Sequence, residues 1–340
     1  MEAQPGERKP RVLSGIQPTG QLHLGNYLGA IRQWAKAQDE KDCFYCVVDL
    51  HAITVPQDPA ELRASTRGVV ALLLAAGLDP ERCTLFVQSH VRAHAECSWL
   101  LSCVTPLGWL ERMVQYKTKA QRQESVQTGL LTYPVLQAGD ILLYHADEVP
   151  VGEDQKQHVE LTRDIAQRFN HQFGEVLTLP RTVMPAAGAR IMGLDDPTNK
   201  MSKSLDISGG HAVRLTDPDK RIEKAIKRAV TDSGNEIVFS DDPEKAGVNN
   251  LLTIYQALTD QTQEAVLADF ADARGYGDLK KRVAEVTIEA LRPIREEYEH
   301  LMSDLAELDR QLSIGADRAG EIAEATVLSM KDAMGFLIPG

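Results

Sequence analysis

The chain has 340 residues, of which 43% are hydrophobic and 25% are charged, and its formal net charge is -12 at pH 7. This composition is ordinary for a globular protein with a real core, and at about 150 residues per domain the length predicts two domains. No run approaches the length of a membrane span, about 18–20 apolar residues. The polar segment 1–10 lacks the apolar stretch of a signal peptide, and we expect it to be a disordered extension.

Residues 11–38 predict a strand, a loop and a helix in succession. Residues 11–16 have the apolar character of a short buried strand, and in the helix predicted over 27–38 Leu28 and Ile31 fall on one face. The loop between them reads Gln-Pro-Thr-Gly-Gln-Leu-His-Leu-Gly-Asn. In an open α/β sheet, ligands bind at such strand-to-helix loops.

This first loop has the residues of a phosphate-binding turn. Gly20 and Gly25 allow the backbone to approach a ligand closely, and the following helix offers unpaired N–H groups at its N-terminus. His23 adds a side-chain donor that reaches the same phosphates. The spacing differs from the dinucleotide fingerprint, and a glycine-rich loop on its own is equally often plain turn chemistry.

A second candidate phosphate segment lies far downstream. Lys200, Met201, Ser202, Lys203 and Ser204 follow an Asp-Pro pair in a stretch without strong periodicity. The two lysines supply point charges and the two serines supply hydrogen-bond donors for a triphosphate. A lysine–serine tract is usually a solvated surface, so the specific signal is its occurrence together with the first loop.

Strands and helices alternate up to about residue 151. Apolar runs predict strands over 42–50, 83–88 and 148–151, and an amphipathic helix over 59–76 separates the first two. This order predicts an α/β fold with a Rossmann-like, doubly wound parallel sheet. A helical insertion occupies about 93–147.

Helices dominate the rest of the chain. After a loop-to-helix turn over 152–170, we predict helices at 217–230, 249–258, 262–270, 279–302 and 316–334. The first helix of the C-terminal group has five cations opposite its apolar side: Lys220, Arg221, Lys224, Lys227 and Arg228. A negative net charge does not exclude nucleic-acid binding, which depends on local patches. A solvated basic face is the alternative interpretation.

The cysteines indicate free thiols in a reducing cytoplasm. They are five in number and absent from the last two-thirds of the chain. Cys43 and Cys46 have a metal-like spacing, but there is no second pair and the two sulfurs point to opposite faces of a strand. His90, His94 and Cys97 could share a helical face, yet a fourth zinc ligand is missing. We predict no protein-bound metal.

The two phosphate segments together resemble the two signatures of the class I aminoacyl-tRNA synthetases. The finer match is to the bacterial-type tryptophanyl-tRNA synthetases, over segments 15–20, 23–30, 48–54, 133–134, 140–144, 151–158 and 188–192. The resemblance extends from about residue 11 to the C-terminus. It implies ATP-dependent activation of L-tryptophan to tryptophanyl-adenylate and transfer to tRNA(Trp), with release of pyrophosphate and AMP.

The resemblance also implies site residues for ATP. The implied ATP ligands are Gln17, Pro18, Thr19, Gly25, Asn26, Gly152, Glu153, Asp154, Ile191, Lys200, Met201, Ser202, Lys203 and Ser204. The implied catalytic residues are His23, Asn26, Lys119, Lys200 and Lys203. Mg²⁺ should accompany ATP on its phosphates without a dedicated protein cage.

For the amino acid, the resemblance assigns Asp140 as the acceptor of the indole N–H, a donor that costs free energy if it is buried unpaired. Tyr133 and Gln155 would hold the α-ammonium group, and His51 would lie near both substrates, although a core histidine is the alternative. The other implied pocket residues are Gln17, Gln137, Val149 and Val151.

Three positions depart from the family pattern. Many relatives have Met at Gln137, Ala at Gly139 and Phe at Leu13. Because Tyr133, Gln137 and Asp140 also resemble the side-chain pocket of tyrosyl-tRNA synthetases, tyrosine is the second candidate substrate. A tRNA-independent nucleotidyltransferase and a non-catalytic tRNA-binding protein are alternatives from other classes, disfavoured by the helical C-terminal part and by the intact signatures.

The resemblance finally implies a domain organisation. A catalytic domain over 11–205 would be followed by a tRNA anticodon-binding domain over 206–312 and by a C-terminal helix within 313–340 that returns to the catalytic domain. The family is homodimeric, with the insertion at the interface, so we expect a homodimer.

Overall fold

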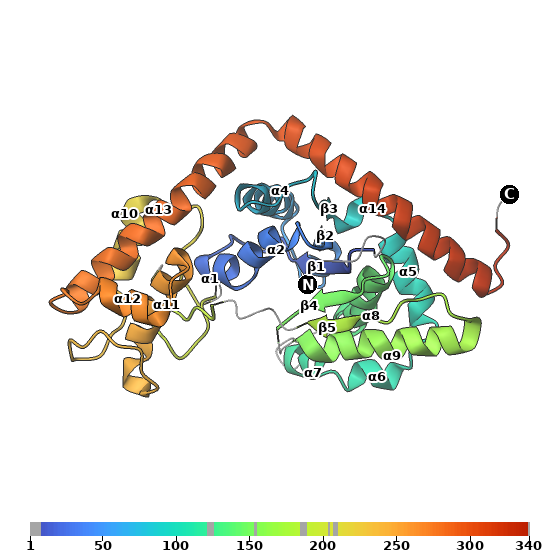
Figure 1. Ribbon diagram of the computed structural model, residues 1–340. Helices are drawn as coiled ribbons and strands as arrows, with labels where there is room; N and C mark the ends of the chain where they lie inside the picture. Colours follow the sequence, from blue (N-terminus) through green and yellow to red (C-terminus); the bar gives the residue numbers. More distant parts are fainter. Residues whose placement is uncertain are drawn as a thin grey trace.

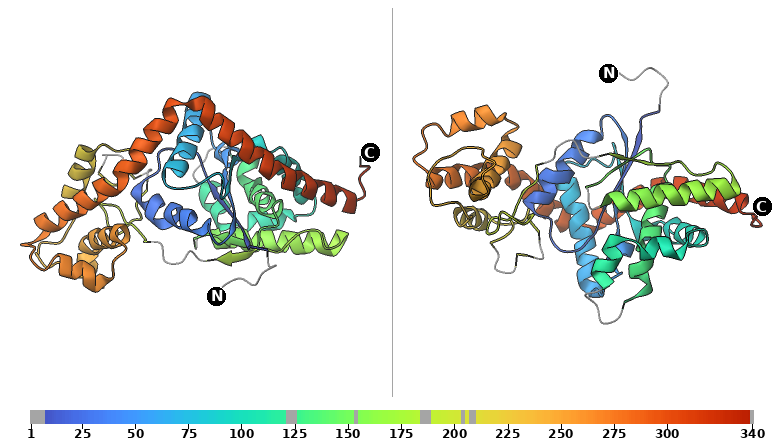
Figure 2. Two further views of the ribbon diagram at one scale, coloured as in Figure 1. Left: turned by 45° about the horizontal axis from the view of Figure 1, so that its top comes forward. Right: turned by 90° about the horizontal axis from the view of Figure 1, so that it is seen from below.

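The computed structural model describes residues 8–120, 126–152, 155–183, 189–202, 205–206 and 210–338. A sheet part and a helical part are connected by two long helices, α13 (Tyr276–Ser303) and α14 (Leu305–Ala333), which form the two sides of an arch (Figure 1). Figure 2 shows the helical part at one end of this arch and the C-terminal end of α14 at the other. In the described ranges, none of the helices combines the length and the apolar character that a membrane crossing requires.

Five parallel strands form the sheet, in the order β3-β2-β1-β4-β5. They are β1 (Arg11–Ile16), β2 (Asp42–Val47), β3 (Thr84–Val87), β4 (Glu148–Pro150) and β5 (Arg181–Val183). The predicted Rossmann-like parallel sheet is confirmed. Strand β5 was not predicted, because its three residues are partly exposed and carry no apolar pattern. The chain order reverses between β1 and β4, which is where ligands bind in sheets of this kind.

Helices cover both faces of the sheet. In the sheet part they are α1 (Leu24–Asn26), the π-helical η1 (Tyr27–Ile31), α2 (Arg32–Ala37), α3 (Asp49–Ala52), α4 (Pro59–Ala75), η2 (Gln88–His90), α5 (Ala93–Ser102), α6 (Leu107–Glu111), α7 (Val114–Ala120), α8 (Thr128–Leu142) and α9 (Lys156–Phe173). One apolar cluster joins α1, η1 and α4 to the sheet and continues into the helical part. A second cluster joins α5, α8, α9 and α14 to the opposite face.

Two element boundaries near the sheet differ from the prediction. The strand predicted over 42–50 ends at Val47, and the chain turns at once into α3. The carboxylate of Asp49 accepts hydrogen bonds from the backbone N–H and the hydroxyl of Ser89 after β3, which stabilises this turn. The helix predicted from residue 27 begins at Leu24 instead.

Residues 8–10, which the sequence assigned to a disordered extension, lie along the sheet part. The Arg8 guanidinium pairs with the Asp147 carboxylate at 2.9 Å, and Lys9 donates to the carbonyl oxygen of Asp39. The first seven residues of that extension lie outside the described ranges.

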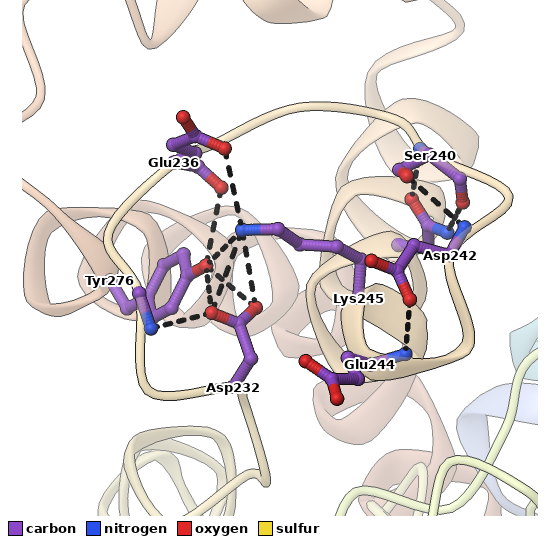
Figure 3. A network of polar contacts seen from close by, with 9 residues as sticks. Asp232, Glu236, Ser240, Asp242, Glu244, Lys245 and Tyr276 are labelled. Carbon is purple, nitrogen blue, oxygen red and sulfur yellow. Dashed lines mark hydrogen bonds and ion pairs between the residues drawn. The ribbon is translucent and has the colours of Figure 1, made fainter.

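The helical part consists of α10 (Asp219–Lys227), η4 (Pro243–Lys245), α11 (Ala246–Thr259), α12 (Gln263–Asp269) and the first half of α13. The loop between α10 and η4 is held by a polar cluster (Figure 3). Its centre is the Tyr276 hydroxyl, which lies 2.7 and 2.8 Å from the two carboxylate oxygens of Asp232 and 3.0 Å from Nζ of Lys245. Lys245 also pairs with Asp232 at 3.4 Å, so one cation joins three segments of this part.

The last helix begins eleven residues earlier than the predicted range 316–334, at Leu305. The Asp304 carboxylate caps it by accepting a hydrogen bond from the N–H of Glu307, which allows a new helix to begin directly after α13. Helix α14 then crosses β3 closely, since a Cβ atom at Gly315 would overlap the carbonyl oxygen of Leu85. Further along, Thr326 donates to the carbonyl oxygen of Leu143, so the C-terminal helix packs on the sheet part.

Candidate active site

A cavity of about 370 Å³ opens beside β1, β2 and β4. Its lining contains all eight residues that were expected to bind the amino-acid substrate: Gln17, His51, Tyr133, Gln137, Asp140, Val149, Val151 and Gln155. The remaining lining is largely apolar or small and includes Leu13, Gly15, Cys46, Val48 and Ile141. A mostly apolar cavity with a few convergent polar groups is typical of a small-molecule site.

Asp140, on α8, carries a buried carboxylate with three donors around it. Its Oδ1 lies 2.6 Å from Nε2 of Gln88 and 2.6 Å from Nδ1 of His94, and its Oδ2 lies 2.7 Å from Nε2 of His51. Burial raises the pKa of the Asp140 carboxyl, but His51 and His94 outweigh burial and hold the pKa well below its ordinary value. The side chain is therefore an anion, and an acceptor only, at neutral pH.

The structure combines the two interpretations of His51. The ring is buried and bonded to Asp140, as a satisfied core histidine would be, and it also lines the cavity. It lies on α3, the helical turn after β2, at the carboxyl end of the strand.

Tyr133 lies on the same side of the cavity as Gln137 and Asp140, because the spacing of four and three residues places all three on one face of α8. Its hydroxyl is 2.9 Å from Nε2 of His158 on α9. Burial raises the pKa of Tyr133 to about 12, so the hydroxyl keeps its proton at neutral pH. Gln155 stands at the N-cap of α9.

The three departures from the family pattern have different surroundings. Gln137 lines the cavity, and within the described ranges its carboxamide has no hydrogen-bond partner. Leu13 also lines the cavity. Gly139 instead faces α5, where a Cβ atom would lie 3.5 Å from the backbone nitrogen of Ser98. An alanine there would make an ordinary contact outside the cavity.

The first loop is compact around His23. Gly20 has a φ of 68°, which favours glycine. The carboxamide oxygen of Asn26 accepts from the backbone N–H of His23 at 3.1 Å. At Gly25 a Cβ atom would lie 3.1 Å from Nδ1 of His23 and 3.4 Å from Cβ of Met201. The two predicted phosphate segments, which are far apart in sequence, therefore pack against each other through Gly25 and Met201.

The other residues of the first loop follow β1. Gln17 lies at the cavity, Pro18 is buried and Thr19 is half-buried. A smaller cavity of about 250 Å³ adjoins the loop and is lined by Gly20, Gln21, His23, Asp206, Ala212 and Arg214. Segment 213–215 is bound to the loop by two backbone hydrogen bonds, from Leu24 to Val213 and from Leu215 to Leu22.

The second loop is described up to Ser202. Lys200 is exposed, and Met201 is buried and donates its N–H to the carbonyl oxygen of Ile191 at 3.0 Å. Ser202 has a buried hydroxyl without a hydrogen-bond partner in the described ranges. Ile191 itself is 1% exposed.

Several predicted site residues lie outside the described residues. They are Lys203 and Ser204 of the second loop, Glu153 and Asp154 after Gly152, and the side chain of Lys119 at the end of α7. Gly152 is described and exposed, and it directly follows Val151, which lines the first cavity.

The helical part supports the second loop. Asn250, on α11, accepts from the N–H of Met192 at 2.8 Å and donates to its carbonyl oxygen at 2.9 Å. His211 packs over Gly193, where a Cβ atom would overlap its ring, and Nδ1 of His211 lies 2.5 Å from Asp195. Met192 pairs with Lys200 as an antiparallel bridge, so these contacts hold the strand-like segment from which Lys200 projects.

The basic helix is α10, and its apolar face is buried as predicted through Ile222, Ala225 and Ile226. Arg221 pairs with Asp217 at 3.1 Å and Lys227 with Glu223 at 2.6 Å. The other three predicted cations, Lys220, Lys224 and Arg228, are exposed.

Sequence reasoning missed the residues behind Asp140. Gln88 and His94 come from η2 and α5, at sequence separations of 52 and 46 residues from Asp140. His94 was considered only as a candidate zinc ligand. The one available signal was its place among apolar residues of α5, since a buried histidine requires a polar partner.

Comparison with known proteins agrees with this geometry. The family model "tRNA synthetases class I (W and Y)" matches residues 4–292. A tryptophan–tRNA ligase of a Synechocystis strain is 53% identical over 97% of this chain and 99% of its own length. A tryptophanyl-tRNA synthetase structure from Mycoplasma pneumoniae has a TM-score of 0.86 and 39% identity, and covers 97% of this chain and 98% of its own.

A second structure, from Campylobacter jejuni, is of a tryptophanyl-tRNA synthetase complexed with ADP and tryptophan. It has a TM-score of 0.84 and 35% identity, and covers 96% of this chain and all of its own. The sheet with its two juxtaposed signature segments, the family model and the full-length relatives agree: the chain belongs to the class I tRNA synthetases of the tryptophan and tyrosine group.

Proposed function

We propose that the chain activates L-tryptophan with ATP and transfers the tryptophanyl group to tRNA(Trp). The observation that carries this function is the ionised, buried carboxylate of Asp140 at the wall of a mostly apolar cavity, which fits an aromatic amino acid with one polar hydrogen on its ring. Such a group accepts the single N–H of an indole ring, while apolar neighbours bury the rest of the ring. The relatives named as tryptophan–tRNA ligases support the same choice.

The reaction needs no protein nucleophile. A carboxylate oxygen of tryptophan attacks the α-phosphorus of ATP, the bond to the β-phosphate bridging oxygen breaks, and pyrophosphate leaves with that electron pair. A terminal ribose hydroxyl of tRNA then attacks the carbonyl carbon and releases AMP. The protein accelerates this reaction in two ways: it aligns the substrates, and it stabilises the charge that develops on the phosphates.

For tryptophan, we assign the indole N–H to Asp140 and the α-ammonium group to Tyr133 and Gln155. Tyr133 is suited because its raised pKa keeps the hydroxyl neutral beside a cation. Val149 and Val151 would form the apolar wall, and His51 and Gln17, which also line the cavity, would lie close to the bound substrates.

For ATP, we assign the phosphates to His23, Asn26 and the second loop with Lys200, Lys203 and their serines. Support comes from the contact of Gly25 with Met201 and from the cavity beside His23. Ile191, Gly152, Glu153 and Asp154 would hold the adenosine. Mg²⁺ would bind the ATP phosphates, and the described residues contain no cluster of three or more candidate metal ligands.

We also propose how the chain meets its larger partners. The helical part would bind tRNA, with the exposed cations of α10 as part of the contact. The insertion exposes four large apolar side chains, Trp99, Leu107, Val114 and Val126, whose burial in a homodimer would remove them from water. The five free cysteines fit a reducing compartment, the cytoplasm.

The testing experiment is amino-acid-dependent exchange of labelled pyrophosphate into ATP, run with each of the twenty amino acids. Exchange with tryptophan alone, followed by charging of tRNA(Trp), is the expected result. Exchange with tyrosine would transfer the proposal to the second candidate substrate, and no exchange with any amino acid would contradict the activation step.

A further inference from the structure

Behind Asp140 lies a chain of buried polar groups that does not reach the cavity. His94 is fully buried on α5, with Nδ1 2.6 Å from Oδ1 of Asp140 and Nε2 2.8 Å from the hydroxyl of Tyr144. Tyr144 is fully buried as well, and its ring packs on Phe44 and Phe86. Two polar side chains in an apolar cluster cost free energy unless they bond each other, as these do.

The chemistry of Asp140, His94 and Tyr144 determines which atom donates in each of their two hydrogen bonds. A carboxylate oxygen can only accept, so the His94 nitrogen that faces Asp140 carries a hydrogen. In a neutral imidazole the other nitrogen then accepts, and the Tyr144 O–H donates to it. The hydrogen bond from Tyr144 therefore stabilises the His94 tautomer that donates to Asp140.

The lone-pair directions of the Asp140 carboxylate show which of its acceptor positions these hydrogen bonds leave open. A carboxylate offers about four lone-pair directions. Gln88 and His94 use those of Oδ1, and His51 uses one of Oδ2. The remaining direction belongs to Oδ2, the oxygen that also accepts from His51. Asp140 and His51 both line the cavity.

The geometry points to His94 as a positioning residue for amino-acid selection: with Tyr144 and Gln88 it holds the Asp140 carboxylate so that one Oδ2 lone pair is presented to the indole N–H. This inference rests on the proposed role of Asp140 as the indole acceptor. It extends amino-acid recognition to three residues that do not belong to the cavity lining: Gln88, His94 and Tyr144.

The test compares tryptophan with its benzothiophene analogue, in which sulfur replaces the N–H. Pyrophosphate exchange gives kcat/KM for both compounds and KM for ATP. The wild-type protein is expected to prefer tryptophan, and Asp140→Ala is expected to abolish the preference. His94→Leu should reduce the preference roughly tenfold, the effect of one charge-assisted hydrogen bond, by raising KM for tryptophan while KM for ATP stays unchanged.

Two conservative variants separate positioning from packing. His94→Asn places an amide N–H near the position of Nδ1 and should restore most of the preference. Tyr144→Phe removes only the hydroxyl and should reduce the preference by a smaller factor, roughly threefold. Phe169→Leu, a buried aromatic residue of the same apolar cluster on α9, is the matched control and should leave the preference unchanged.

The outcomes distinguish this inference from the function on which it rests. A preference that survives Asp140→Ala would overturn the assignment of the indole acceptor itself. A preference lost in Asp140→Ala but retained in His94→Leu and Tyr144→Phe would overturn the role of His94 alone. If His94→Leu does not fold, the comparison of Tyr144→Phe with Phe169→Leu decides the question.

Discussion

The carboxamide of Asn250 pairs with both main-chain polar groups of Met192, accepting from its N–H at 2.8 Å and donating to its carbonyl oxygen at 2.9 Å. This pairing imitates a neighbouring β-strand, but it comes from a single buried side chain of α11. The segment with Ile191 and Lys200 is therefore attached to the helical part, in addition to its contact with the His23 loop.

Asn250→Ala should loosen the proposed ATP site without changing the tryptophan cavity. Loss of two buried hydrogen bonds should lower the free energy of unfolding by about 1–3 kcal/mol. KM for ATP should rise, and KM for tryptophan should stay within error in pyrophosphate exchange. Asn249→Ala is the control, because that amide binds the backbone of Ser240 instead. Equal changes in both KM values would contradict the assignment.

Lys200→Ala should lower the rate of activation. The exposed ammonium group is proposed to bind the leaving pyrophosphate, and removal of one such group costs on the order of 100-fold in kcat. Lys220→Ala, an exposed lysine of α10, should leave exchange unchanged and reduce only tRNA charging. An unaltered kcat in Lys200→Ala would remove this residue from the phosphate site.

Gln137→Met should tighten tryptophan binding. The carboxamide lines the cavity without a hydrogen-bond partner in the described ranges, and an apolar ring packed against it leaves it unpaired. We expect KM for tryptophan to fall roughly threefold to tenfold, with no gain of activity on tyrosine. A rise in KM would mean that the carboxamide hydrogen-bonds the substrate.

Trp99→Glu should convert the proposed homodimer to a monomer. The indole of Trp99 is 70% exposed in the single chain, and a buried carboxylate at an interface opposes association. Sedimentation velocity measures the change directly. Val238→Glu, at an exposed apolar position of the helical part, should not alter the mass. A wild-type chain that sediments as a monomer would refute the dimer.

The raised pKa of Tyr133 makes a prediction for alkaline pH. Burial raises this pKa from 10.0 to about 12. The folded state therefore keeps a proton that the unfolded state loses, and the associated stability is complete below pH 10 and is lost as the pH rises towards 12. Urea unfolding should show a smaller loss of stability over this interval in Tyr133→Phe than in the wild type. Parallel pH profiles would contradict the burial of this hydroxyl.

The sequence predicted the elements whose signals are local. Strand β1, the glycine loop with His23, and helix α4 between Asp58 and Gly77 all carry their own turn or capping residues: Asp58 accepts two backbone N–H groups, and Gly77 has a φ of 104°. The residues that the resemblance assigned to the amino acid line one cavity, and the spacing of Tyr133, Gln137 and Asp140 places these three on one face of α8.

What the sequence could not provide was long-range pairing. Nothing in the spacing links Asn250 to Met192, or His94 to Asp140, because these contacts arise only after α5, α8 and α11 are packed. Strand β5 and the π-helical turn η1 have no distinctive composition, and their form depends on neighbouring elements. The sequence therefore revealed the candidate site residues, but not the distant residues that hold them in place.

The return of α14 to the sheet has a mechanical consequence. The helical part is attached to the sheet part at several places. They include the backbone bonds of segment 213–215 to the His23 loop, the ion pair of Arg32 with Asp260, the packing of α4 on α13, and the arch that ends on β3. Several attachments restrain rotation more than a single hinge would, so any displacement of the helical part must break or stretch at least one of them, and one of these contacts lies on the His23 loop.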